Sequence, residues 1–76
     1  MAWRAPKRLM ILGHWVEVRL VTAEEMRDAV ADNDGARGAW DLDTSTIFLL
    51  KSLSTAERNH TFWHEVMHAL VDFLDP

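Results

Sequence analysis

The stretch from residue 54 to residue 74 restricts the fold of this chain more than any other part of its sequence. Ser54 and Glu57 form a capping box, and the helical spacing that follows predicts a helix over residues 55–74. At 3.6 residues per turn, the apolar side chains of this helix cover roughly 200° of its circumference. They are Phe62, Trp63, Val66, Met67, Ala69, Leu70, Val71, Phe73 and Leu74. We therefore expect most of the helix to be buried.

The polar arc that remains open on this helix carries a His-Glu-x-x-His pattern. Residues four apart project from the same side of a helix, so His64 and His68 can present two imidazole nitrogens to one metal ion. The Glu65 carboxylate could reach a water on that metal and take its proton. The pattern therefore predicts a zinc site with Glu65 as the catalytic group. The alternative is a helix whose solvent-exposed face carries two histidines and a glutamate by chance, without a metal site.

The rest of the arc and its surroundings favour the metal site over that alternative. Thr61, Asp72 and Asp75 lie on the same polar arc as the motif. This arc is the one part of the helix circumference that the apolar residues do not cover. The positions directly around the motif are uncharged, which a solvated helix would not show. A metal site in a cleft requires such an accessible arc on an otherwise buried helix.

The remaining elements are predicted from alternation, capping and turn residues. Residues 10–21 alternate between two faces and predict one strand, with Trp15 on its more polar face. Thr22 and Glu25 form a capping box for a helix over residues 23–32, whose apolar side has Met26, Ala29 and Val30. Strands at residues 38–43 and 46–51 flank a turn of Asp43, Thr44 and Ser45. The order β-α-β-β-α predicts an α+β domain in which a small, mostly antiparallel sheet packs on the long helix.

Length and composition limit the function. A chain of 76 residues is one domain, and residues 1–8 are expected to form a flexible arm. There is no cysteine, so a metal or self-association is left to stabilise so small a core. The net charge of −4, with basic residues clustered only near the start, disfavours a nucleic-acid partner. The apolar run at residues 9–12 is too short for a signal peptide or a membrane span, so we expect a cytoplasmic protein.

The uncharged helix around the motif, with Thr61 three residues before His64, resembles the active-site helix of zincin metallopeptidases. A hairpin that ends in an apolar strand before a capped helix is similar to the ImmA/IrrE-type branch and to small phage-encoded zincin-like proteins. The similarity covers about residues 10–74. It implies a metallopeptidase that binds Zn²⁺ and cleaves a specific intracellular protein, in the host cytoplasm if it is phage-encoded.

The resemblance also implies a third zinc ligand, an acidic residue on a later helix, for which few residues remain after His68. Asp72 would stand in line with both histidines, and three such ligands on one straight helix span about 12 Å, too far for one metal. Asp72 could ligate the zinc only if the helix end unwinds, and as an alternative it could accept the free ring N–H of His68. Asp75, nearer the frayed end, is the preferred internal ligand. A second subunit that supplies the acid, in a homodimer, is also open.

His60 and His14 are weaker candidates for metal ligands. His60 continues the straight series with the motif histidines, and His14 could reach the cleft only if its strand face turns toward the helix. Two functions follow from these considerations. One is a zinc metallopeptidase acting on a protein or peptide. The other is an inactive zincin-like module that binds a host factor, with structural zinc or none.

Overall fold

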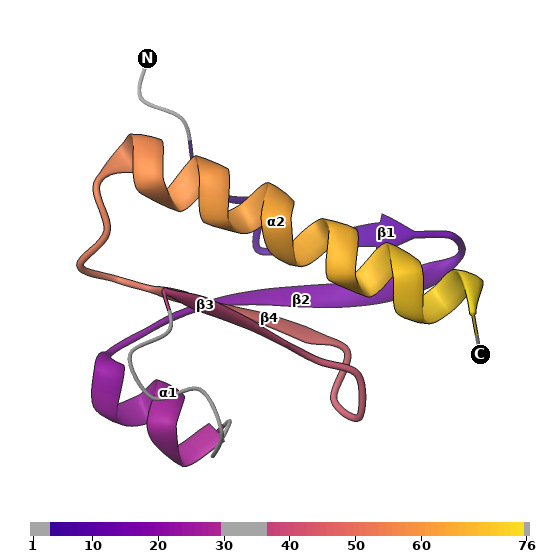
Figure 1. Cartoon of the computed structure of the whole chain (residues 1–76), viewed down its shortest axis with the longest axis horizontal. Helices are drawn as coiled ribbons and strands as arrows, with labels where there is room; N and C mark the ends of the chain where they lie inside the picture. Colours follow the sequence, from indigo (N-terminus) through magenta and orange to yellow (C-terminus); the bar gives the residue numbers. More distant parts are fainter. Residues whose placement is uncertain (1–3, 30–36, 76) are drawn as a thin grey trace.

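A computed structural model describes residues 4–29 and 37–75 of the chain. The elements are β1 (Arg8–Ile11), β2 (His14–Val21), α1 (Ala23–Ala29), β3 (Gly38–Asp41), β4 (Thr46–Leu50) and α2 (Thr55–Leu74). The four strands form one mixed sheet, with α2 lying along one face and α1 against the other (Figure 1). The predicted α+β class is confirmed. None of the described helices is long and apolar enough to cross a membrane.

The first predicted strand is in fact a hairpin of two strands. β1 and β2 pair antiparallel, with Leu9 opposite Val16, and Leu12 and Gly13 form the connection. Both connecting residues have positive φ, 49° and 83°, which two-residue hairpin loops of type I′ require. The apolar run at residues 9–12 and the alternation after it concealed this turn, because only Gly13 signals it in the sequence.

The predicted flexible arm at residues 1–8 includes residues that are part of the fold. β1 begins at Arg8, inside the segment that we expected to be flexible, and Ala5 packs against the core. Residues 1–3 lie outside the described part of the chain.

The sheet order is β1-β2-β4-β3, and it places β4 inside and β3 at an edge. β2 and β4 are parallel, while the other two pairs are antiparallel. Side chains of β4 alternate between two cores: Ile47 and Leu49 join Phe62 of α2, whereas Phe48 joins Met26 of α1. Because both faces of β4 are covered, its apolar run is almost continuous. The edge position of β3 leaves one side of this strand unpaired within the described sheet.

The capping boxes and the helix bounds follow the sequence closely. Thr22 and Glu25 exchange side-chain to backbone hydrogen bonds of 2.9 and 3.1 Å at the start of α1. Ser54 and Glu57 do the same for α2, which spans the predicted residues. Of the predicted apolar side of the first helix, Met26 is buried and Ala29 is exposed, while Val30 and residues 31–36 lie outside the described part. The second hairpin is shorter than predicted, and Ser45 in its turn has a positive φ.

The burial of α2 differs from the prediction in both directions. Several apolar residues assigned to the core are exposed: Trp63, Met67, Leu70, Val71 and Leu74. Thr61 and Glu65, assigned to the open arc, are each only 7% exposed. The physical reason is that one sheet face covers a single side of the helix, and the helix is turned so that the Glu65 side faces the strands. The apolar arc of α2 is broader than the side that the sheet covers, so the arc alone did not predict which side of the helix is buried.

Candidate metal centre

The two motif histidines converge on the exposed flank of α2. Nε2 of His64 and Nε2 of His68 are 3.1 Å apart, and the ring planes are inclined by 79°. Two nitrogens bound to one tetrahedral zinc at 2.0–2.1 Å would be about 3.3 Å apart. Donor type and separation therefore fit two ligands of one zinc ion. The i, i+4 spacing on a regular helix is sufficient to produce this arrangement.

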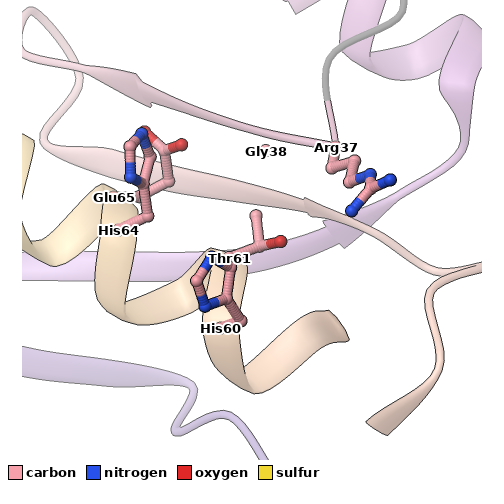
Figure 2. A pocket seen from close by; sticks show the side chains of 6 residues that line it. All are labelled: Arg37, Gly38, His60, Thr61, His64 and Glu65. Carbon is pink, nitrogen blue, oxygen red and sulfur yellow. The ribbon is translucent and has the colours of Figure 1, made fainter. Parts of the chain in front are cut away.

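Glu65 lies beside this pair and lines the same two hollows as His64, with its side chain next to that of His64 (Figure 2). Its side chain is buried, and removal from water raises the pKa of its carboxyl above the ordinary value. Positive charge on His68 and His64 acts in the opposite direction and lowers this pKa. A carboxylate whose pKa is raised toward neutrality is better suited to accept and return a proton than one at the ordinary value.

A close approach between α2 and β3 explains why Glu65 is buried. A Cβ atom added at Gly38 would lie 2.5 Å from Cγ2 of Thr61, 3.0 Å from the Phe48 carbonyl oxygen and 3.4 Å from Cγ of Glu65. Only glycine leaves room for the helix at this point. Figure 2 shows the Thr61 methyl directed toward Gly38 with Glu65 beside it. We did not single out Gly38 in the sequence, although a glycine at the start of an apolar strand was the available signal.

Two open hollows adjoin along the groove between α2 and β3, and both are lined by Gly38, His64 and Glu65. The first, of about 340 Å³, lies toward the start of the helix (Figure 2). Its other lining residues are Arg37, His60 and Thr61. The second, of about 360 Å³, continues toward the helix end. Its other lining residues are Ala39, Trp40, His68 and Asp72. The predicted histidines and the glutamate thus share one elongated cleft.

The backbone of β3 presents hydrogen-bonding groups to this cleft. The Leu50 N–H donates to the Arg37 carbonyl at 3.0 Å, so Arg37 directs its backbone toward β4. Backbone direction alternates along an antiparallel strand, and Gly38 and Trp40 therefore direct their N–H and C=O groups to the free edge. Both residues line the cleft beside the histidines. An extended peptide could add to the sheet at this edge.

Asp72 is held by the edge strand. Trp40 donates its indole N–H to Oδ2 of Asp72 at 2.7 Å, and the Trp40 ring packs edge-on against Phe73 at 5.5 Å. His14 stacks on the other side of Phe73, with ring centroids 4.2 Å apart. The β2 face that bears His14 is therefore turned toward α2, but His14 contacts an aromatic ring and does not line the cleft.

Of the two remaining candidate ligands, His60 borders the cleft and Asp75 does not line either hollow. His60 is exposed in the first hollow, one turn before His64. Asp75 is the exposed C-cap residue of α2, and its backbone N–H donates to the Val71 carbonyl. Within residues 4–29 and 37–75, no three His, Cys, Asp or Glu side chains are grouped so that they could hold a metal ion. The described part of one chain thus brings together two candidate zinc ligands, His64 and His68.

Comparison with protein-family models, curated proteins and solved structures gives no match for this chain. The geometry of the cleft is therefore the basis for the functional argument.

Proposed function

We propose that this protein is a zinc-dependent metallopeptidase that hydrolyses a peptide bond in a specific intracellular protein. The observation that carries the proposal is the pair of Nε2 atoms 3.1 Å apart on His64 and His68, next to the buried carboxylate of Glu65. Two imidazoles and a carboxylate with raised pKa in one open cleft are the groups that hydrolysis by a zinc-activated water uses.

The motif residues would have two roles, metal binding and proton transfer. His64 and His68 would hold Zn²⁺, which when bound supplies Lewis acidity for activating water and polarising a carbonyl. Glu65 would accept the proton of the attacking water and return it to the leaving amine nitrogen. The burial of Glu65 supports this role, because a carboxylate with a raised pKa gains a proton more readily and can then donate it.

The free edge of β3 would hold the substrate. A peptide in extended conformation would exchange backbone hydrogen bonds with Gly38 and Trp40, which places its chain along the groove beside Glu65. β3 has only four residues, so few such bonds are available. Recognition through a short edge agrees with action on a specific protein more than with general digestion.

Replacement of the base tests the catalytic role. Glu65→Gln keeps the shape of the side chain and leaves both histidines in place, so the zinc content should not change. Peptide cleavage should fall by about 10²–10⁴-fold, the usual contribution of a positioned acid–base group. The assay is mass spectrometry of new termini in a proteome-derived peptide library, with zinc measured by inductively coupled plasma mass spectrometry. Glu17→Gln, an exposed change on β2, is the matched control and should cleave like the parent protein.

A second candidate is a zincin-like binding module without catalysis. The absence of a third ligand among the described residues around His64 and His68 favours it. The two candidates separate in the same experiment. If Glu65→Gln retains zinc and the full biological effect of the protein, the peptidase proposal is wrong.

A further inference from the structure

The outer face of α2 carries an exposed apolar stripe, defined here as Trp63, Met67, Leu70, Val71 and Leu74. Trp63 is 55% exposed, and Met67 and Leu74 are each 66% exposed. Residues 63, 67, 70 and 74 follow one another at intervals of four, three and four, the spacing of the contact seam between two packed helices. An isolated surface helix has no need for such a seam.

We propose that the stripe pairs with the same stripe of a second copy, with the two α2 helices antiparallel, and that the partner's Asp75 completes the metal site. The size of the stripe supports pairing. Its exposed side chains present on the order of 500 Å² per copy, so a pair would bury about 1,000 Å², the lower end for a specific interface. The proposal of a shared metal site rests on the proposed zinc-binding function, whereas the pairing itself does not.

Charge and register favour the antiparallel arrangement. The cleft side of α2 bears His60 and His64 toward the start of the helix, and Asp75 lies at its end. Parallel pairing would bring like ends together, whereas antiparallel pairing places the acidic end beside the histidines and opposes the helix dipoles. Antiparallel pairing therefore places the Asp75 carboxylate of each copy toward the histidines of the other.

The register brings the partner's Asp75 close to the motif. If Trp63 packs against the partner's Leu74, and Met67 against the partner's Leu70, the partner's Asp75 lies about 3 Å along the axis from the level of His64. At 3.6 residues per turn, His64 and Asp75 lie on the same flank of the stripe. Like flanks face each other in an antiparallel pair. The exposed C-cap position leaves the Asp75 side chain free to turn toward the neighbouring cleft.

The antiparallel pair would supply the third zinc ligand that the described residues of one chain lack. Within one chain, the described residues supply two imidazoles, while catalytic zinc sites use three protein ligands. Asp72 lies in the cleft, but its Oδ2 accepts the Trp40 indole N–H at 2.7 Å. A carboxylate from the second copy would be the third ligand, and two equivalent sites would form in each dimer.

The first experiment tests the pairing by sedimentation velocity on the zinc-free protein. The parent chain should sediment as a dimer at micromolar concentration. Met67→Asp should be monomeric, because it places a charge in the seam. Met10→Asp is the matched control, since Met10 is 53% exposed on β1 and away from the stripe, and it should remain dimeric. A monomeric parent, or a dimer that both variants disrupt equally, would overturn the pairing.

The second experiment tests the shared site by mixing two variants that each lack one part of it. Asp75→Asn alone, and the double variant His64→Ala/His68→Ala alone, should each bind at least tenfold less zinc than the parent at limiting free zinc. A mixed dimer contains one site with both histidines and the partner's Asp75. Mixing should therefore restore zinc to one ion per mixed dimer, measured after separation by affinity tags.

The outcomes of the mixing experiment are distinct. Parent-like zinc in Asp75→Asn, or no recovery in a confirmed mixed dimer, would overturn the shared site. A parent dimer that binds no zinc would overturn both the shared site and the proposed metallopeptidase, and would leave the pairing standing.

Discussion

Each face of α2 carries side chains of the kind that is usually found on the other face. The face toward the sheet buries Phe62 and Ala69 but also the carboxylate of Glu65, whereas the outer face exposes Trp63 and Met67. Burial of a carboxyl costs free energy, and exposure of large apolar groups forgoes the gain from removing them from water. A helix selected for the stability of a single chain would carry the reverse pattern at these positions.

The two faces of α2 correspond to the two roles proposed for this helix. The buried carboxyl of Glu65 lies at the cleft, where its raised pKa would serve the proposed proton transfer, and the exposed apolar stripe has the spacing of a helix–helix contact seam. Local departures from good packing are expected at functional sites. Substitutions on the two faces should therefore differ in their effect on stability.

Neighbouring aromatic residues on opposite faces should differ most in their contribution to stability. Phe62→Ala should lower the free energy of unfolding by about 3–5 kcal/mol, because it leaves a cavity at a side chain only 2% exposed. Trp63→Ala should cost less than about 2 kcal/mol when measured below the concentration at which chains associate, because Trp63 is 55% exposed and its ring contact is an edge-on one with Phe62 at 5.1 Å. Urea denaturation measures both, and Phe62→Leu serves if Phe62→Ala does not fold. Equal costs for the two alanine variants would contradict the assignment of the faces.

The close contact between β3 and α2 should be sensitive to one methyl group. Gly38→Ala should lower the free energy of unfolding by about 1–3 kcal/mol, since the new Cβ would overlap Cγ2 of Thr61. Thr61→Ser removes that methyl group, so Gly38→Ala/Thr61→Ser should recover part of the loss. Thermal unfolding of the two single variants and the double variant gives the coupling. If the effects simply add, Thr61 does not determine how closely the helix approaches the strand.

The pH dependence of stability should change when Glu65 is replaced. Because burial raises the pKa of this carboxyl in the folded chain, ionised Glu65 destabilises the fold above that pKa. In zinc-free protein, Glu65→Gln should therefore raise the melting temperature at pH 7. The advantage should diminish as the pH falls and be absent below the ordinary carboxyl pKa of 4.5, where both states of the parent are protonated. An advantage that persists or grows at low pH would show that the carboxylate is not the cause.

Much of the secondary structure could be predicted from local signals. Both capping boxes, at Thr22 and Ser54, fix helix starts because their hydrogen bonds form within four residues of chain. The position of α2 and the class of the fold followed from them. The turn at Leu12 and Gly13 was missed because a type I′ loop depends on two positive φ angles, of which only the glycine is a recognisable sign.

The convergence of His64 and His68 follows from the local sequence, because a spacing of four residues on a helix places two side chains on one side regardless of the surrounding fold. Which arc of α2 is buried could be seen only from the contacts between α2 and the sheet. The buried arc depended on where β3 approaches the helix, and the approach depends on the missing Cβ of Gly38, which is 23 residues before Thr61 in the sequence. Periodicity gives the angles between side chains on a helix. It does not give the rotation of the helix against the sheet, which is set by contacts between distant segments.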